Sequence, residues 1–426
     1  MRVLVVGGGG REHALAWKLS QEDEVFSAPG NPGIAQIAET FPVRADNEEG
    51  MVALCEQIAP EVVLVGPENP LLAGLGDRLR ARGVSVFGPS AAAAALEGSK
   101  AWAKEQMLVA GVPTAHHQSF RDFDAAVAYA ASRFDGGRQV AVKASGAALG
   151  KGVVVAQTHE EARDALEAML VDREHGEAGA TVVVEDALVG REFSLLALVS
   201  ETEVRCLPVA QDYKRALDGD HGPNTGGMGS VSPVSWLTED LVARAEREVI
   251  VPIVRHLAAQ GLDYRGCLFA GLLVEDGTPY CLEYNVRFGD PETQSIVRRL
   301  GPGFAQAILD VAEGRPIGAI EVTRDAAVSV VVASGGYPGT IETGFPIDIG
   351  PMPEGVEIFH AGTASLDGCL VTAGGRVFAV SAVGSTVADA RERAYAGGAQ
   401  VGFAGAWCRR DIGACTKGQS ASRQTD

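Results

Sequence analysis

The sequence predicts a multidomain protein of mixed α/β and α+β class, with a doubly wound parallel sheet at its N-terminus. The first hundred residues alternate short apolar segments with helical patterns, as parallel strands joined by helices do. The later residues instead contain pairs of apolar segments joined by glycine-containing turns, which is typical of antiparallel sheet. The 426-residue chain is long enough for two to three such domains.

The N-terminal region is predicted to contain four strands with helices between them. The strands are expected at 3–6, 25–27, 62–65 and 84–87, and the helices at 12–19, 33–38, 48–58 and 71–82. A further helix is expected over 91–95, and another follows Gly98-Ser99-Lys100 and ends near Gly111. In a sheet of this kind, ligands bind beyond the carboxyl ends of the strands.

The middle of the chain is predicted as α+β and the last part as a small β-rich domain. Strand pairs are expected at 139–143 with 153–157 and at 268–274 with 279–283, and helices at 160–171 and 239–259. After residue 325, short strands at 328–333, 356–359, 370–372 and 376–383 precede one helix at 387–396. The last dozen residues are polar, and we expect them to be frayed.

The charge balance limits the possible partners. Lys and Arg number 36 against 55 Asp and Glu, which gives a formal net charge of −19. This acidity argues against a nucleic-acid partner and against an anionic membrane surface, and no apolar run approaches the ~20 residues of a membrane-spanning helix. The seven cysteines are scattered, without a C-x-x-C pair, which favours a reducing compartment. We therefore expect a soluble cytoplasmic protein.

A run of four glycines follows the first predicted strand and opens a helix. It is a poor dinucleotide fingerprint, because Glu12 stands at the third glycine position and no acidic residue ends the second strand. Such a turn suits a phosphate or another small anion, or it is only a tight turn. The loops at 30–33 and 66–69 also follow strands, so they either share this edge as a site or are ordinary turns.

The segment 145–152 resembles a phosphate-binding loop but does not match the P-loop pattern. Three residues separate Gly146 from Gly150 where four are required, and Gly152 stands where Ser or Thr would contact magnesium. The flanking segments are both predicted strands. A glycine hairpin that carries Lys151, with Lys143 rising from the sheet, could fold over a polyphosphate; the alternative is a flexible hairpin with solvated lysines.

Glu283-x-Asn285 is the most specific local feature. Side chains two residues apart on a strand project to the same side, and both offer the oxygen ligands that Mg²⁺ prefers beside nucleotide phosphates. Arg287 follows closely and could stabilise the charge of a phosphoryl group in transfer. The alternative is an edge strand that ends in a salt-bridged turn. The glycine-rich loop 224–229, preceded by Lys214 and Arg215, is a weaker signal for anion binding.

Taken together, these motifs resemble the phosphoribosylamine–glycine ligases, also called glycinamide ribonucleotide synthetases, which are ATP-grasp enzymes. The resemblance runs nearly end to end. It rests on Gly7-Gly8-Gly9-Gly10-Arg11-Glu12-His13-Ala14, Gly30-Asn31-Pro32-Gly33, Gly66-Pro67-Glu68, Gly150-Lys151-Gly152, 223–229, Arg287-Phe288-Gly289-Asp290-Pro291-Glu292, 333–339 and Arg410-Asp411-Ile412-Gly413. The run that begins at Arg287, with its preceding Glu-x-Asn, is highly specific, whereas the glycine turns alone are not.

The resemblance implies an ADP-forming ligation in purine biosynthesis. ATP phosphorylates glycine, and the nitrogen of 5-phosphoribosylamine attacks the glycyl phosphate, giving glycinamide ribonucleotide, ADP and phosphate. It implies Mg²⁺ or Mn²⁺ as the metal and a monomer or weak homodimer. It also implies an N-terminal substrate-binding domain (1–103), an ATP-grasp domain (104–325, with a mobile lid at about 115–190), a C-terminal domain (326–413) and a disordered tail (414–426).

The resemblance further implies a role for each residue that matches a family motif. Arg287 and Asp290 would be catalytic, and Glu283 and Asn285 would hold the metal. ATP would be bound by Lys143, Ser145, Gly150, Lys151, Gly152, Glu185, Leu188 and Glu192. Glycine and phosphoribosylamine would be surrounded by Gly9, Asn31, Pro32, Glu68, Asp212, Lys214 and Asn224.

Four features depart from the family pattern. Ser145 replaces an Asp, Ala147-Ala148-Leu149 replaces Leu-Ala-Ala, Tyr213 stands where His is common, and the segment near 396–407 is looser than usual. None removes a metal-binding or phosphoryl-binding group, so we expect altered loop kinetics rather than lost activity. One alternative is another ATP-grasp carboxylate–amine ligase or carboxylase, which should not share the N-terminal loops together with 223–229. A non-catalytic nucleotide-binding module is a further alternative; it predicts the loss of Glu283, Asn285 or Arg287, and all three are present.

Overall fold

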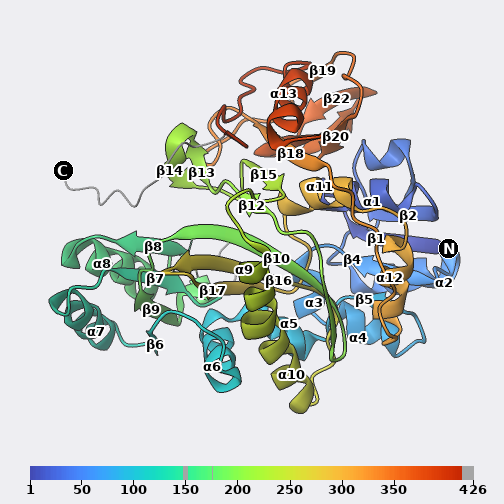
Figure 1. The fold of residues 1–426 in the computed structure, drawn as a ribbon. Helices are drawn as coiled ribbons and strands as arrows, with labels where there is room; N and C mark the ends of the chain where they lie inside the picture. The colour runs from blue at the N-terminus through green and yellow to red at the C-terminus, as the bar shows by residue number, and fades with distance from the viewer. Residues whose placement is uncertain (147–151, 175, 415–426) are drawn as a thin grey trace.

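The N-terminal sheet consists of five parallel strands in the order β3–β2–β1–β4–β5. Figure 1 labels β1, β2, β4 and β5 of this sheet, near the N-terminus. The computed structural model describes residues 1–146, 152–174 and 176–414. The strands are β1 (Arg2–Gly7), β2 (Glu24–Pro29), β3 (Glu39–Thr40), β4 (Val62–Val65) and β5 (Val86–Phe87). The helices are α1 (Gly10–Leu19), α2 (Glu48–Ile58), α3 (Glu68–Leu72) and α4 (Leu75–Arg80). The predicted parallel α/β sheet is therefore confirmed.

Three details of this region differ from the sequence prediction. The helix expected at 33–38 is only a 3₁₀ turn, Ile34–Gln36. The helix expected at 71–82 is divided into α3 and α4 at Gly74, whose φ of +92° is incompatible with a continuing right-handed helix. Strand β3 was not predicted, because a two-residue strand of Glu and Thr has no apolar run.

A four-stranded antiparallel sheet forms a lobe with a hydrophobic core of its own. Its order is β6–β9–β7–β8, with β6 (His117–Phe120), β7 (Val140–Ala144), β8 (Val153–Ala156) and β9 (Val182–Asp186). Helices α7 (Phe123–Asp135) and α8 (His159–Leu166) pack on it, followed by a π-helical turn, Glu167–Val171, and a 3₁₀ turn, Gly176–Gly179. The buried apolar residues of this core all fall between 120 and 184. We refer to residues 117–186 as the lid lobe.

A second four-stranded sheet forms the body beside the lid lobe. Its order is β11–β10–β16–β17, with β10 (Arg191–Ser200), β11 (Glu203–Cys206), β16 (Arg265–Glu275) and β17 (Thr278–Asn285). Residues Asp276 and Gly277 form the predicted turn with φ of 49° and 75°. The surrounding helices are α5 (Ala91–Gly98), α6 (Lys100–Ala110), α9 (Glu239–Ala245), α10 (Val251–Ala259) and α12 (Phe304–Ala312).

The single helix expected at 239–259 is interrupted. A π-helical turn, Glu246–Ile250, separates α9 from α10. Pro252 lies in the first turn of α10 and has no backbone N–H to donate to the preceding turn, which accounts for the break.

The third large sheet contains strands from two distant parts of the chain. Its order is β12–β15–β18–β23–β20, where β12 (Gln211–Asp212) and β15 (Gly229–Ser232) come from the middle of the sequence. The others are β18 (Ala326–Ala333), β20 (Val356–His360) and β23 (Arg376–Gly384). β15 pairs directly with β18. The predicted C-terminal strands therefore exist, but their sheet begins about a hundred residues earlier than the boundary expected at 325.

Short elements complete the fold. They are the hairpins β13 (Arg215–Leu217) with β14 (His221–Asn224) and β21 (Thr363–Leu366) with β22 (Cys369–Thr372), the pair β19 (Asp348–Ile349) with β24 (Val401–Gly402), helices α11 (Glu292–Ile296) and α13 (Val387–Gly398), and 3₁₀ turns at Asp218–Asp220 and Val297–Arg299. Across the described ranges, no helix is both long and apolar enough to span a bilayer. The six cysteines within the described part of the chain are free thiols.

Candidate active site

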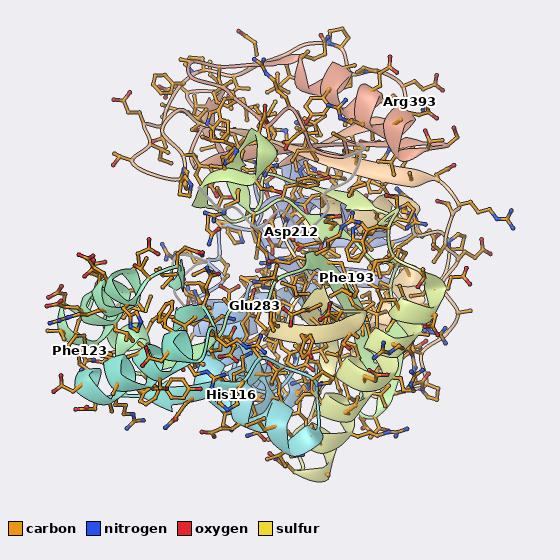
Figure 2. All side chains as sticks on the ribbon, turned by 60° about the vertical axis from the view of Figure 1, so that its left-hand side comes forward. His116, Phe123, Phe193, Asp212, Glu283 and Arg393 are labelled. Carbon is orange, nitrogen blue, oxygen red and sulfur yellow. The ribbon has the colours of Figure 1, made fainter. Side chains whose placement is uncertain are left out.

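A cavity of about 1630 Å³ lies where the N-terminal region, the lid lobe, the body and the C-terminal strands meet. Its wall includes Arg11 and Glu68 from the N-terminal region, Glu185 from the lid lobe, Glu283 from the body and Arg376 from the C-terminal strands. In Figure 2, Asp212 and Glu283 lie near the centre of the molecule, between Phe123 of the lid lobe and Arg393 of α13.

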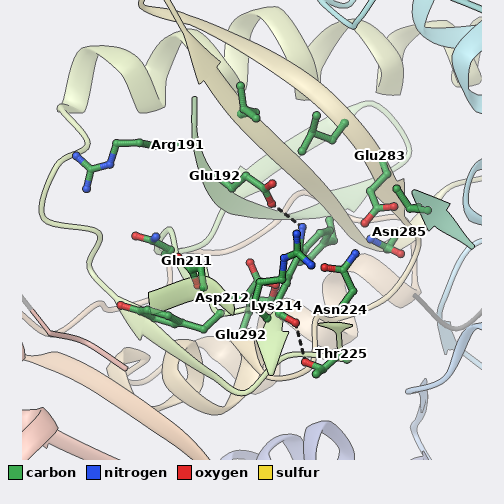
Figure 3. Close-up of a pocket in the computed structure, with 18 of the residues that line it drawn as sticks. Arg191, Glu192, Gln211, Asp212, Lys214, Asn224, Thr225, Glu283, Asn285 and Glu292 are labelled. Atoms are coloured by element: carbon green, nitrogen blue, oxygen red, sulfur yellow. Dashed lines mark hydrogen bonds and ion pairs between the residues drawn. The ribbon is translucent and has the colours of Figure 1, made fainter. Parts of the chain in front are cut away.

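Glu283 and Asn285 project into this cavity from the end of β17, side by side as the strand alternation predicts (Figure 3). Burial alone would raise the pKa of Glu283, but Lys214, Lys100, Lys143 and Arg287 together lower it, so the side chain is a carboxylate. The described residues contain no group of three or more His, Cys, Asp or Glu that could enclose a metal. One carboxylate and one amide oxygen fit a Mg²⁺ ion that takes its remaining ligands from phosphates and water.

Arg287 is held by two carboxylates and by backbone. Its Nη2 lies 3.0 Å from Oε1 of Glu97 and donates to Oδ1 of Asn285 at 3.3 Å. Its Nε lies 3.5 Å from Oε2 of Glu68, and its Nη1 donates to the carbonyl of Phe288 at 3.2 Å. Burial lowers the pKa of Arg287, but Glu97 and Glu68 more than offset this and raise it above its usual range. The guanidinium therefore stays charged in the cavity wall.

Asp290 links the site to the C-terminal strands. Its carboxylate lies 3.3 Å from Nη2 of Arg376 and accepts a bond from Gln294 at 2.8 Å. Burial would raise the pKa of Asp290, but Arg376 and Arg11 keep it below its usual range. Arg376 also donates to the carbonyls of Gly226 and Asp290. One arginine from β23 thus holds both the glycine-rich loop and the segment after β17.

Glu185 forms a buried ion cluster with two lysines. Its Oε2 lies 2.7 Å from Nζ of Lys104, and its Oε1 is paired with Nζ of Lys143. All three side chains are less than a tenth exposed. Burial opposes the charge of Glu185, but the two lysines lower its pKa to about 2. One carboxylate beside two ammonium groups leaves a net positive charge, which suits a phosphate.

Burial affects the two lysines of this cluster unequally. Burial is strong enough to lower the pKa of Lys104 despite Glu185, whereas the pKa of Lys143 is raised because Glu185 and Glu283 together outweigh burial there. The neighbouring cavity wall is apolar, which suits a flat ring system. Its residues include Leu96, Met107, Ala141, Val155, Leu188 and Leu273.

A second charged group surrounds Lys214 (Figure 3). Nζ of Lys214 lies 2.8 Å from Oε2 of Glu192. Burial lowers the pKa of Lys214, but Glu192, Asp212 and Glu283 raise it well above its usual range. Burial raises the pKa of Glu292 to about 7, and the charge of Asp212 adds to this effect. The hydroxyl of Ser194, which donates to Glu292 at 3.0 Å, lowers the pKa only in part. Asn224 completes this side of the cavity.

Most of the predicted site residues meet in this cavity, but not all. Its wall contains Lys143, Gly152, Glu185, Leu188, Glu192, Glu68, Asp212, Lys214, Asn224, Glu283, Asn285, Arg287 and Asp290. Gly9, Asn31, Pro32 and Ser145 are described residues that lie outside its wall. Gly150 and Lys151 fall outside the described residues, as does all of the predicted tail except Ala414.

The side chain of Asn31 is fully engaged in hydrogen bonds within the protein. Its Nδ2 donates to the carbonyls of Gly8 and His360 at 2.9 and 2.8 Å, and its Oδ1 accepts from the amides of Gly33 and Ile34. Ser145 is engaged in a similar way, since its Oγ accepts from the amide of Ala101 at the start of α6. Both side chains therefore connect neighbouring segments of the backbone by hydrogen bonds.

Several residues of the cavity wall were not predicted from the sequence. Lys100 and Lys104 stand four residues apart on α6 and therefore lie on the same face of the helix. This spacing was the signal in the sequence that could have identified them. Glu97 lies three residues before Lys100, in the last turn of α5. Arg376 is far from every motif, and only the pairing of β23 brings it to the site.

Three family models match the chain in order: the phosphoribosylglycinamide synthetase N domain over residues 1–97, the ATP-grasp (A) domain over 98–293 and the C domain over 327–415. Phosphoribosylamine–glycine ligase from Mesorhizobium japonicum is 45% identical over 97% of this chain and 98% of its own length. The enzyme of the same name from Vibrio cholerae is 43% identical over 97% of this chain and 98% of its own length.

Solved structures agree with this assignment. The crystal structure of phosphoribosylamine–glycine ligase from Thermotoga maritima is 36% identical, with a TM-score of 0.84 over 97% of this chain and 100% of that chain. The biotin carboxylase domain of 2-oxoglutarate carboxylase from Hydrogenobacter thermophilus is 17% identical, with a TM-score of 0.73 over 95% of this chain and 91% of that chain, and shares the fold. The chain therefore belongs to the phosphoribosylglycinamide synthetase family.

Proposed function

We propose that the protein joins glycine to 5-phosphoribosylamine with ATP, giving glycinamide ribonucleotide, ADP and phosphate in purine biosynthesis. The observation that carries this proposal is the arrangement of Glu283, Asn285 and Arg287 in one cavity with a buried cluster of lysines. The name that the curated relatives carry supports the choice of the two substrates.

The chemistry requires glycine to be activated first. A carboxylate resists attack by an amine until one oxygen can leave as phosphate. Lys104 and Lys143 offset the charge of the ATP phosphates, and Arg287 offsets the charge of the phosphoryl group in transfer. Glu283 and Asn285 would hold a divalent cation, Mg²⁺ or Mn²⁺, which when bound supplies further positive charge to the phosphates. The side chains thus align two anions that would otherwise repel each other.

The acyl phosphate must then be protected from water. The lid lobe has its own core, which supports its movement as one body over the cavity. We place the domain boundaries at about residues 103 and 325, as expected from the sequence. The sheet that contains β15 and β18 includes strands from both sides of the second boundary. Leu188 and the apolar wall around it would receive the adenine, with Glu185 beside the ring and Glu192 on the ribose.

The acceptor side of the cavity would hold glycine and phosphoribosylamine. Glu68, Asp212, Lys214 and Asn224 line it, and their mixture of carboxylate, ammonium and amide suits an amine that carries a phosphate. Gly9, Pro32 and Asn31 would act by shaping the adjoining loops, because the side chain of Asn31 is bonded within them. Scattered free thiols among the described residues support a reducing compartment such as the cytoplasm.

The deciding experiment is an ADP-release assay with ATP, Mg²⁺, glycine and freshly prepared phosphoribosylamine. Each component is omitted in turn. We expect ADP release to require all four and to match glycinamide ribonucleotide formation mole for mole. ADP release that ignores glycine would refute the ligase assignment, and release with another carboxylic acid in its place would favour a different ATP-grasp ligase.

A further inference from the structure

Glu97 lies at the point where the N-terminal region touches the metal-binding strand. It belongs to the last turn of α5, and its side chain is 10% exposed in the cavity wall. One carboxylate oxygen, Oε2, accepts a bond from the amide of Val286 at 2.7 Å. The other, Oε1, lies 3.0 Å from Nη2 of Arg287. A single carboxylate therefore holds both the backbone just after Asn285 and the guanidinium that follows.

These contacts fix the direction in which Arg287 can donate. Of its five N–H groups, one on Nη2 donates to Asn285 and one on Nη1 donates to the carbonyl of Phe288, while Nη2 also lies 3.0 Å from Glu97. Nε lies 3.5 Å from Glu68 but makes no hydrogen bond to a described residue. Among the described residues, this leaves Nε and the second N–H of Nη1 without a hydrogen-bond partner, and the second N–H of Nη1 is the one that we expect to meet an oxygen of a bound ligand. Without Glu97, the guanidinium would be free to rotate about its last bonds.

Glu97 is better suited to this task than Glu68. The distance from Arg287 to Glu97 is 3.0 Å, within hydrogen-bonding range, whereas the distance to Glu68 is 3.5 Å. The last turn of α5 packs closely against α3, since a Cβ at Gly98 would meet the end of the Leu72 side chain.

We propose that Glu97 is a positioning residue for phosphoryl transfer, which orients Arg287 and keeps it in register with the metal ligand Asn285. This proposal rests on the proposed function, since it assigns Glu97 to the transfer step of that reaction. Its consequence is that the N-terminal region, which binds the acceptor substrate, also holds the arginine that acts on the phosphoryl group. The acceptor-binding region and the arginine of the phosphoryl-transfer step are then connected through the side chain of Glu97.

The test compares Glu97→Gln with wild type. The amide retains an acceptor for Val286 but removes the charge that faces Arg287. We expect kcat to fall about 10- to 100-fold, as for other partners that orient a catalytic group, while KM for ATP changes less than about threefold. Glu97→Asp keeps the charge one methylene short and should recover part of the loss. Glu48→Gln, which breaks the 2.7 Å ion pair with Arg78 in the same region, is the matched control and should leave kcat unchanged.

A double variant tests whether Glu97 acts through Arg287. If it does, Glu97→Gln combined with Arg287→Ala has the same kcat as Arg287→Ala alone. A further fall by the single-variant factor would overturn the proposal, as would a wild-type kcat in a stably folded Glu97→Gln. Slow ATP hydrolysis without phosphoribosylamine separates the two hypotheses. If wild type hydrolyses ATP at the same rate with and without glycine, the proposed function fails. The hydrolysis rates of Glu97→Gln and wild type still test the role of Glu97: a lower rate in the variant supports it, and an equal rate contradicts it.

Discussion

Replacing Glu185 by Gln should destabilise the protein strongly. It leaves the buried ammonium group of Lys104 without its ion-pair partner and that of Lys143 with Glu283 as its remaining negative neighbour. In the wild type, the pKa of Glu185 is lowered from 4.5 to about 2 by Lys104 and Lys143. A carboxylate with a lowered pKa stabilises the folded state fully above its ordinary pKa. That stabilisation is lost as the pH falls from about 4.5 toward 2.

The size of the effect follows from the same shift. A displacement from 4.5 to about 2 corresponds to roughly 3 kcal/mol at neutral pH, at about 1.4 kcal/mol for each tenfold change. Removing one partner from a buried ion pair typically costs about 3–5 kcal/mol, in agreement. At about 2–4 °C per kcal/mol for a cooperative unit of roughly 150–250 residues, we therefore expect the transition of the unit that contains Glu185 to lie roughly 6–12 °C lower in Glu185→Gln than in wild type.

Inorganic tripolyphosphate supplies the missing negative charge and so tests the cause. It should raise the transition of Glu185→Gln by more than that of wild type, because Lys104 and Lys143 then regain a partner. Asp186→Asn is the matched control: Asp186 is the next residue on β9 and forms two 2.7 Å bonds with the partly exposed Arg133. That variant should lose about 1 kcal/mol or less and respond to tripolyphosphate as wild type does. An equal response in Glu185→Gln and wild type would refute the reasoning.

Three further predictions concern the site and its supports. Arg287→Ala should lower kcat by two or more orders of magnitude and leave ATP affinity by calorimetry nearly unchanged; unaltered turnover would remove its assigned role. Glu283→Gln should raise the Mg²⁺ concentration for half-maximal activity at least about tenfold, and an unchanged Mg²⁺ titration would exclude Glu283 as a metal ligand. Gly33→Ala places a Cβ 2.3 Å from His13 and 2.5 Å from His360, so we expect a loss of roughly 1–3 kcal/mol in thermal unfolding, and full stability would mean that these rings can move aside.

The sequence predicted the parallel sheet because β1 and β4 each contain an uninterrupted run of four apolar residues and helical patterns lie between the strands. Strand β4 was predicted at its observed bounds, as was helix α2, which begins after the capping residue Asn47. The break between α3 and α4 was missed because a glycine can stand within a helix or end one, and only its backbone angle shows which. Strand β3 lacks apolar residues altogether, so no pattern could have indicated it.

Site residues were predictable where the chemistry is local and not where it depends on packing. Glu283 and Asn285 share one strand, so alternation alone places them together. Glu97 bonds with a residue 189 positions away, and Lys104 meets Glu185 through the docking of α6 against β9. No sequence spacing encodes such contacts.

The sheet in which β15 pairs with β18 limits where the chain can be cut to make a fragment or a chimera with a related protein. A fragment that ended at residue 325 would keep β12 and β15 but lose the strand that hydrogen-bonds to β15, and an uncovered strand edge favours aggregation. The hydrophobic core beneath this sheet also draws residues from both chain termini, from Val3 to Ile412. A chimera built at that boundary would therefore divide one folding unit, and it would take the glycine-rich loop 224–229 and the Arg376 that bonds to it from different relatives.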